Sequence, residues 1–305
     1  MNYIFSLLIC TKDRLDQLSR TLSIMSAQIL SEELDVVIID DGSSDGTYEF
    51  VKNNYPAIRA FRNQRSLGLM ACRNFLLENA KGKYSISLDD DAHILTPEYT
   101  KKLLSFFNDN PKCAVAALRI FWSVDEPSRI DTLDKPQQVQ SFVGCGHVWN
   151  MHAWKEIDPY PEWFEFYGEE DYASYQLFKN GWKVLYYPAI LVQHRVDLKQ
   201  RKKDRENYYS RLGKGIRAGW FLYAMFYPLK PAIRMISYSL WIKLKNDVFK
   251  GDLRMLLILI SVVKDFIFNC HRFINSNRLT MKEYKEFKKI DKAKIYWTPK
   301  EKQSR

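Results

Sequence analysis

The chain has 305 residues, of which 46% are hydrophobic and 27% charged, a composition that supports one large buried core and excludes general disorder. Its net charge of +10 is unevenly divided, because residues 1–194 carry 19 Lys and Arg against 26 Asp and Glu, whereas residues 195–305 carry 27 against 10. This asymmetry predicts an acidic body and a basic extension that meets an anionic surface. The five cysteines include no CxxC pair, and no basic leader precedes the apolar start, so we expect neither a zinc site nor export.

The first 120 residues alternate short apolar runs with longer helical patterns, which predicts a parallel α/β sheet. The ligand site of such a sheet lies beyond the carboxyl ends of its strands. The predicted strands are Ile4–Cys10, Val36–Ile39, Ile58–Phe61, Tyr84–Leu88 and Ala114–Phe121, and the predicted helices are Leu15–Ala27, Thr47–Asn54, Leu67–Ala80 and Pro97–Asn108.

The pattern becomes irregular from about residue 125, which indicates a loop over the site, and a strand is expected to return at Gln140–Met151. A helix is predicted over Glu169–Lys179, because an acidic run opens it and Asn180-Gly181 suits its C-terminal cap. Two further strands, Val184–Tyr187 and Ile190–His194, are expected to complete the α/β body.

Three consecutive aspartates, Asp89, Asp90 and Asp91, follow a predicted strand. Adjacent carboxylates are costly to keep ionised unless a cation lies among them, and hard oxygen ligands favour Mg²⁺ or Mn²⁺. The alternative is a solvated turn. The segment Asp40–Gly46 also joins a strand end to a helix start, where a carboxylate can accept hydrogen bonds from a nucleobase or ribose, although helix capping explains the same residues.

Four ordered motifs strongly resemble the family 2 glycosyltransferases, which have a GT-A fold. They are Ser6–Arg14 (SLLICTKDR), Val36–Asp45 (VVIIDDGSSD), Asn63–Asn74 (NQRSLGLMACRN) and Leu88–Asp91 (LDDD). The resemblance covers residues 4–195 and implies a Rossmann-like, mostly parallel central sheet with flanking helices. We therefore expect a GT-A domain over residues 1–195 and a helical extension over residues 196–305.

The resemblance also implies which residues bind the donor, an expected nucleotide-diphosphate sugar. Thr11, Asp13 and Asp41 match positions that contact the nucleotide, and Arg73 matches a basic residue near the donor, although an ion pair explains Arg73 as well. Asp89 and Asp90 are expected near the ribose or sugar, and Gly146 ends a small-residue stretch, Gly144-Cys145-Gly146, beside the sugar. Asp91 and His194 are the implied ligands of Mn²⁺ or Mg²⁺.

Inverting sugar transfer needs a general base that takes a proton from the acceptor hydroxyl. Asp171 resembles the family's Glu-Asp motif at the start of a helix, although acidic residues there also stabilise the helix dipole. Glu170 beside it is expected to contact the acceptor. Aromatic rings can stack on sugars, which makes Trp163 the expected acceptor platform, although core packing explains it equally well.

The segment after His194 combines basic residues with the aromatic run Trp220–Tyr227. This pattern predicts a helix in the interface of an anionic membrane, with ordinary helical packing or an oligomer interface as alternatives. No apolar run reaches the about 18 residues of a spanning helix, and no motif indicates nucleic acid binding. The basic residues are Arg195, Lys199, Arg201, Lys202, Lys203, Arg205, Arg211, Lys214 and Arg217.

Together these features predict an inverting glycosyltransferase that adds a single sugar to a lipid-linked or cell-envelope glycan. We expect it in the cytoplasm, peripheral at the inner face of the cell membrane. Processive synthases usually add a Gln-x-x-Arg-Trp motif and spanning helices, which this sequence lacks. The alternatives are a nucleotidyltransferase, or a non-catalytic glycan- or membrane-binding protein that keeps the fold.

Overall fold

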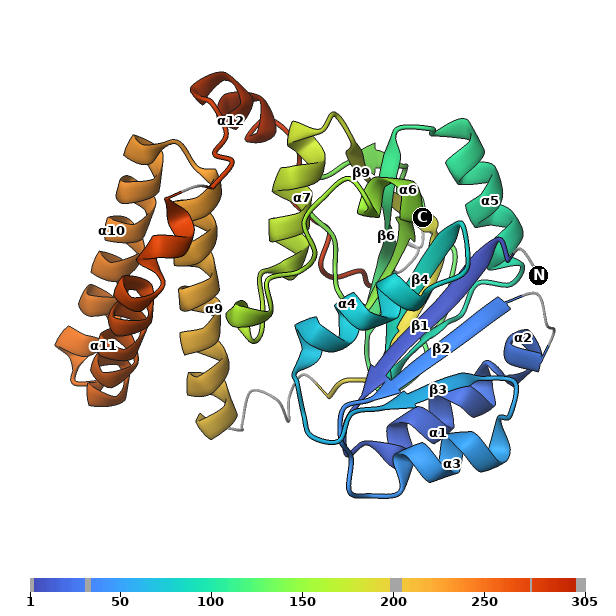
Figure 1. Cartoon of the computed structure of the whole chain (residues 1–305). Helices are drawn as coiled ribbons and strands as arrows, with labels where there is room; N and C mark the ends of the chain where they lie inside the picture. Colours follow the sequence, from blue (N-terminus) through green and yellow to red (C-terminus); the bar gives the residue numbers. More distant parts are fainter. Residues whose placement is uncertain (1–2, 31–33, 198–204, 275, 300–305) are drawn as a thin grey trace, which may run out of the picture.

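A computed structural model describes residues 3–30, 34–197, 205–274 and 276–299, with the side chains of Leu30, Arg205 and Glu206 left out. Within these residues, nine strands form one central sheet with helices on both faces (Figure 1). Lys199, Arg201, Lys202 and Lys203 of the predicted basic segment lie outside the described residues.

The sheet has the order β3-β2-β1-β4-β8-β6-β9-β5, and β7 pairs with β9. The pairings give β1, β2, β3, β4, β6 and β9 one direction and β5, β7 and β8 the other, so the predicted mostly parallel α/β fold is confirmed. The strands are β1 (Phe5–Thr11), β2 (Leu34–Asp40), β3 (Arg59–Arg62), β4 (Tyr84–Asp89), β5 (Ala92–Ile94), β6 (Cys113–Trp122), β7 (Gln137–Gln138), β8 (Gly146–Asn150) and β9 (Lys183–His194).

Two hydrophobic cores lie on opposite faces of the sheet, because successive side chains of a strand point to opposite sides. In β1, Leu8 joins the core beneath α4, α6 and α7, whereas Leu7 and Ile9 join the core beneath α1, α3 and α5. The helices of this body are α1 (Leu15–Ile24), α2 (Ser26–Leu30), α3 (Thr47–Asn54), α4 (Leu69–Asn79), α5 (Tyr99–Asp109), α6 (Met151–Trp154) and α7 (Glu169–Lys179), with the short 3₁₀ helix η1 (Glu162–Phe164).

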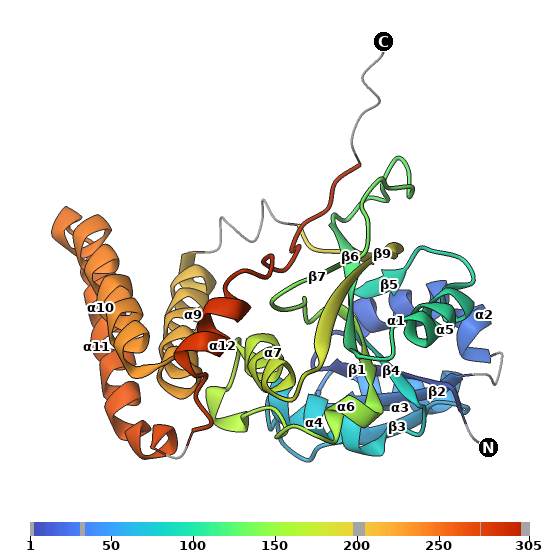
Figure 2. The same ribbon diagram turned by 90° about the horizontal axis from the view of Figure 1, so that it is seen from above.

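The C-terminal extension is helical, as expected, and lies beyond α7 when the molecule is seen from above (Figure 2). The aromatic run Trp220–Tyr227, predicted to face a membrane, instead packs inward: Trp220, Phe221 and Phe226 are buried. This part of the prediction is wrong, because Phe221 and Phe226 pack against the body, whereas Trp220 packs inside the extension against α11. The elements are α9 (Arg205–Phe226), α10 (Leu229–Asn246), η2 (Val248–Lys250), α11 (Leu253–Phe268), η3 (Cys270–Phe273) and α12 (Met281–Phe287).

The boundary between body and extension, expected at residue 195, stays a prediction. Among the described helices, none is long and apolar enough to cross a membrane.

Two predicted strands, Val184–Tyr187 and Ile190–His194, are a single strand, β9. Pro188 lies between them, and the pairing with β6 shifts register there, from Tyr187 opposite Leu118 to Leu191 opposite Arg119. Proline lacks the N–H that a ladder needs, so the strand continues past it only through this irregularity. The sequence therefore suggested a break where the structure has a bulge.

Candidate active site

The predicted donor residues lie together at the carboxyl ends of three parallel strands, β1, β2 and β4. Thr11 ends β1 and pairs with Asp40 at the end of β2, while Cys10 pairs with Asp89 at the end of β4. The turn after β1 is tied to the turn after β2, because the Asp13 carboxylate accepts hydrogen bonds from the Ser44 backbone N–H at 2.7 Å and from the Ser44 hydroxyl at 3.1 Å. Asp13 and Asp91 also line a cavity of about 600 Å³ beside these strand ends.

Asp41 is buried and holds the loop that follows β3. Its two carboxylate oxygens accept hydrogen bonds from Asn63, the Ser66 hydroxyl and the backbone N–H groups of Leu67 and Gly68, at 2.6–2.9 Å. Burial raises the pKa of Asp41, but these hydrogen bonds outweigh it and the net shift is downward. All four bonds come from the chain itself, so Asp41 organises the loop before α4, and its contact with a nucleobase stays a prediction.

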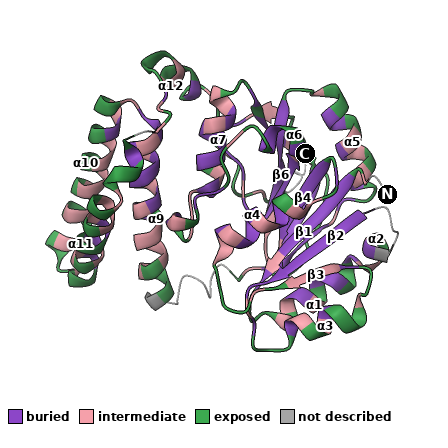
Figure 3. Ribbon diagram, in the orientation of Figure 1, coloured by how far each residue is buried: buried purple, intermediate pink, exposed green. Residues whose placement is uncertain are grey.

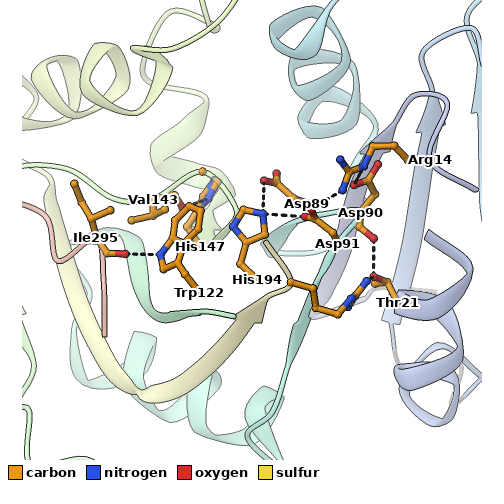
Figure 4. Close-up of polar contacts among 12 residues, drawn as sticks. Arg14, Thr21, Asp89, Asp90, Asp91, Trp122, Val143, His147, His194 and Ile295 are labelled. Carbon is orange, nitrogen blue, oxygen red and sulfur yellow. Dashed lines mark hydrogen bonds and ion pairs between the residues drawn. The ribbon is translucent and has the colours of Figure 1, made fainter. Parts of the chain in front are cut away.

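Asp90 is buried between β1 and α1. Its carboxylate accepts a hydrogen bond from the Thr11 hydroxyl at 2.8 Å and pairs with Arg14 Nε at 2.8 Å, while its carbonyl accepts from Thr21. Burial raises the pKa of Asp90 to about 7, although the charge of Arg14 opposes the shift. These contacts turn Asp90 toward the protein and leave the outer aspartates, Asp89 and Asp91, beside His194 (Figure 4).

His194 reaches the aspartates because β5 and β9 pair with Ala92 opposite His194. Its Nε2 lies 2.9 Å from Asp91 Oδ1 and 3.9 Å from Asp89 Oδ2. Burial raises the pKa of Asp91, but the hydrogen bond and electrostatic interaction with His194 and the ion pair with Arg14 lower it overall. The structure thus brings together the two residues that the sequence proposed as metal ligands.

Ligand atoms of Asp89, Cys145 and His194 lie close enough together to hold a divalent cation, whereas both carboxylate oxygens of Asp91 are engaged, one by His194 and one by Arg14. Two carboxylates with one imidazole suit Mn²⁺, and carboxylates alone suit Mg²⁺. The Cys145 sulfur lies close by: one ligand atom each from Asp89, Cys145 and His194 fall within 4.8 Å of one another. His194 Nδ1 is buried and has no hydrogen-bond partner in the described chain, so Nε2 is the only ring nitrogen engaged by the acidic cluster.

Trp122 of β6 packs against His194 and is itself held by a C-terminal segment. The Trp122 ring lies 4.4 Å from the His194 ring, and its indole N–H donates to the Ile295 carbonyl at 2.7 Å (Figure 4). Trp297 extends this contact, because its backbone N–H donates to Ile120 and its ring lies 4.2 Å from the Arg119 guanidinium. The indole that packs against the imidazole is therefore held by a residue 173 positions away in the chain.

Arg73 joins the aspartate cluster to the start of α7. Its guanidinium is buried and pairs with Glu169 at 2.6 Å and with Asp89 at 3.0 Å, and it donates to the Gly144 carbonyl. Burial lowers the pKa of Arg73, but the carboxylates around it raise it overall, so the group stays charged. The sequence analysis offered two interpretations of Arg73, a donor-site residue and a structural ion pair. The structure agrees with the ion pair, and one of its partners is Asp89, a predicted donor-site residue.

Glu170 and Asp171 follow in the first turn of α7 but have different neighbours. Glu170 lies against Gly144, where an added Cβ would come within 2.6 Å of its Oε1 and 2.8 Å of Arg73 Nη1. Burial and the Glu169 charge raise the pKa of Glu170 well above its ordinary value. Asp171 is solvent-exposed, yet surrounding protein raises its pKa, opposed by a Ser141 hydrogen bond and the Lys288 charge. Glu170, rather than Asp171, borders the Arg73 cluster.

Two predicted site residues are surrounded by apolar side chains rather than by this polar cluster. The space beside Gly146 is filled by Ile120 and Val192, so the glycine that borders the polar site is Gly144. Trp163 packs against Phe221 of α9, with ring centroids 4.9 Å apart, and carries Arg272 over its ring. Its place as an acceptor platform stays a prediction, and its visible contacts are those of packing.

Several polar residues of the site were not among the predicted ones: Arg14, Glu169, Trp122, Arg195 and Cys145. Arg14 and Glu169 lie next to predicted residues in the motifs TKDR and GEED. The sequence could therefore have indicated that they belong to the site, but not which residues they contact. Arg195 donates to Thr21 and Gln17, and its backbone N–H binds the Asp91 carbonyl, which anchors the strand end that carries His194. Only the fold brings these pairs together.

The sequence profile of the family described as glycosyl transferase family 2 matches residues 6–158, half of the chain. The chain belongs to this family. The matched segment of this family 2 glycosyltransferase includes the strand ends with Thr11, Asp41 and Asp89–Asp91. It stops before α7 and His194, so the roles of the α7 carboxylates and of His194 do not follow from this match.

One curated relative is the cholesterol galactosyltransferase of Borreliella burgdorferi (strain B31), which is 34% identical over 92 residues. The alignment spans 29% of this chain and 25% of that protein. This chain therefore matches only a quarter of the relative's length.

Solved structures confirm the GT-A fold. The mannosyltransferase PcManGT of Pyrobaculum calidifontis, in complex with GDP-Man and Mn²⁺, superposes with a TM-score of 0.56 at 11% identity, covering 95% of this chain and 79% of that one. TarS 1–349 of S. aureus with UDP gives 0.57 at 16%, covering 86% and 80%. GalNAc-T7 with UDP, GalNAc and Mn²⁺ gives 0.52 at 19%, covering 64% and 44%. At these identities the likeness concerns the fold alone.

Proposed function

We propose that this protein transfers a single sugar from a nucleotide-diphosphate sugar to an acceptor hydroxyl, with inversion at the anomeric carbon. The observation that carries the proposal is the convergence of Asp89, Asp91 and His194 at the carboxyl edge of the sheet, on a family 2 body. Solved structures with the same fold contain UDP or GDP-Man, and two of them contain Mn²⁺.

The proposal assigns each part of the donor to a part of the site. Thr11, Asp13 and the loop held by Asp41 would receive the nucleotide, because Thr11 ends β1, Asp41 directly follows β2, and Asp13 lines the cavity. Asp91 and His194, with Asp89, would hold Mn²⁺ or Mg²⁺. A bound divalent ion would stabilise the negative charge that develops on the departing nucleoside diphosphate.

The acceptor proton needs a base near the reacting sugar, and the start of α7 supplies two candidates. Glu170 is favoured, because it borders Gly144 and Arg73 and so shares a polar cluster with Asp89. A raised pKa suits a group that must accept a proton near neutral pH. Asp171, the base expected from the sequence, is the second candidate, since its exposed carboxylate also has a raised pKa.

The acceptor is proposed to be a lipid-linked or envelope glycan, or a membrane lipid. The Borreliella relative is named for transfer to cholesterol, a lipid, although it matches this chain over 29% of its length. As the sequence analysis expected, we propose that the protein acts at the cytoplasmic face of a membrane.

A panel of UDP- and GDP-sugars, incubated with Mn²⁺ and membrane lipid extracts, tests this function by mass spectrometry of the products. Glu170→Gln is expected to lower turnover by about 10²–10⁴-fold while nucleotide binding stays intact, because only proton removal is lost. Asp171→Asn is expected to have a much smaller effect. Glu78→Gln, which changes an exposed carboxylate on α4, is the matched control.

The outcomes separate the alternatives. A large loss in Asp171→Asn, with Glu170→Gln active, moves the base to Asp171. If neither variant loses turnover, the first turn of α7 does not hold the base. Binding of nucleotide sugars by folded protein, without turnover of any of them, favours a non-catalytic binding protein.

A further inference from the structure

Exposed apolar side chains are concentrated in one part of the extension. Of the 21 large hydrophobic side chains that are exposed in the described residues, 11 lie between Leu229 and Ile274, which is less than a sixth of the chain. Soluble surfaces usually scatter such residues singly, and a contiguous patch marks an interaction site. The residues are Leu229, Ile233, Tyr238, Trp241, Phe249, Leu253, Leu257, Ile260, Ile267, Phe268 and Ile274.

Helix α11 is apolar on two opposite sides. Its inner side, with Met255, Leu259 and Val262, is buried in the small core of the extension. Its outer side carries Leu253 and Leu257, which are 69% and 67% exposed, and Ile260 and Ile267 continue the same side at helical spacing. A helix with two apolar sides needs an apolar environment on each side, and the described residues provide one for the inner side only.

The neighbouring elements continue this apolar surface. Trp241 of α10 and Phe249 of η2 are 53% and 67% exposed, and their rings are in contact at 6.2 Å between centroids. Helices α10 and α11 are the outermost elements of the extension, at the left of Figure 3, where exposed and half-buried residues dominate. Tryptophan prefers the boundary between lipid and water, because its ring is apolar and its N–H is polar.

The charge of the same segment indicates what covers it. Residues 229–274 contain eight Lys and Arg against three Asp and Glu, a net charge of +5. Lys245, Lys250 and Lys264 are exposed around the apolar side chains. A second copy of the chain would bring the same positive charge to the contact, whereas an anionic lipid surface would neutralise it.

We propose that the outer side of α11 (Leu253, Leu257, Ile260 and Ile267), together with Trp241 of α10, Phe249 of η2 and the lysines among them, forms a docking face that lies flat in the interface of an anionic lipid bilayer. The helices lie on the membrane, since none of the described helices can cross one. This inference deepens the proposed function, because it assigns the surface that would bring the active site to a lipid acceptor. The docking face takes the place of the buried run Trp220–Tyr227 as the proposed membrane contact.

Vesicle flotation of the full chain tests the docking face. The wild type is expected to float with phosphatidylcholine vesicles that contain phosphatidylglycerol and to bind pure phosphatidylcholine much more weakly. Leu253→Gln/Leu257→Gln is expected to lower partitioning about tenfold or more. Lys245→Gln/Lys250→Gln is expected to lower it by a similar factor on anionic vesicles only, and high salt should do the same.

Leu133→Gln is the matched control, because Leu133 is 91% exposed on the body and lies outside the docking face. It should float like the wild type. Two results would overturn the inference: equal flotation of Leu253→Gln/Leu257→Gln and wild type, or a wild type that does not float and forms a dimer that these substitutions dissociate. Release of nucleotide from the donor, measured without vesicles, tests the proposed function separately, so the two ideas can fail independently.

Discussion

At the scale of single residues, the site is built from carboxylates whose surroundings differ. Asp41 is held ionised by four hydrogen bonds, Asp90 is turned into the protein beside Arg14, and Asp91 faces His194. Adjacent acidic residues therefore have different partners. The sequence shows their spacing, but the partners that distinguish them come from other elements.

Asp41→Asn is expected to destabilise the fold by about 1–3 kcal/mol at pH 7, because an amide leaves the donors of the loop poorly matched. The folded pKa of Asp41 lies below the ordinary value of 3.8, so the ionised carboxylate stabilises the fold above that pH. This stabilisation is lost as the pH falls through the lowered pKa. Urea denaturation at pH 7 and at acidic pH should show the difference between variant and wild type shrinking with acid; an unchanged difference would contradict the loop-holding role.

Arg73 and Glu169 form a buried ion pair. Removing one partner should destabilise the fold more than removing both. Arg73→Met is expected to cost about 3–5 kcal/mol, since it leaves the Glu169 carboxylate buried without its cation. Arg73→Met/Glu169→Met should recover most of that loss, because neither charge remains. Denaturation midpoints of the two variants measure this, and a double variant no more stable than the single one would show that the pair does not act as a unit.

At the scale of elements, the sequence predicted β1, β2, β4, β6 and α7 well, because their apolar runs and end signals are local. It missed β5, which has three residues and exists through its pairing with β9. This pairing places His194 beside Asp91. The sequence resemblance suggested His194 as a ligand, but its support by Trp122 and Ile295 depends on contacts between distant segments and could not be read from local patterns.

The C-terminal segment is expected to contribute to metal binding through Trp122. Removing residues 294–305 deletes the Ile295 and Trp297 contacts and should weaken Mn²⁺ affinity by about 10–100-fold, because supporting contacts orient metal-binding imidazoles. Removing only residues 300–305 keeps these contacts and is the control. Titration calorimetry with Mn²⁺ measures both, and equal affinity of the two shortened chains would exclude the supporting role.

At the scale of the whole molecule, an acidic family 2 body carries a basic helical extension. The charge division follows directly from the sequence. The sequence analysis also predicted a membrane contact, but it assigned this contact to Trp220–Tyr227, whose rings pack inward. Aromatic richness alone does not tell whether a ring faces the body or the outside. The exposed sides of α10 and α11 become evident only when the packing of α9 between them and the body is known (Figure 1).

The most direct test of the proposed activity is Mn²⁺-dependent release of nucleoside diphosphate from nucleotide sugars by the wild type, Asp91→Asn and Asp125→Asn. Asp91 belongs to the proposed metal-binding cluster, whereas Asp125 is an exposed aspartate of the loop that follows β6. We expect the wild type to turn over at least one donor, Asp91→Asn to be slower by about 100-fold or more, and Asp125→Asn to match the wild type. Folded wild type that releases nothing from any donor, or Asp91→Asn with full activity, would contradict the account.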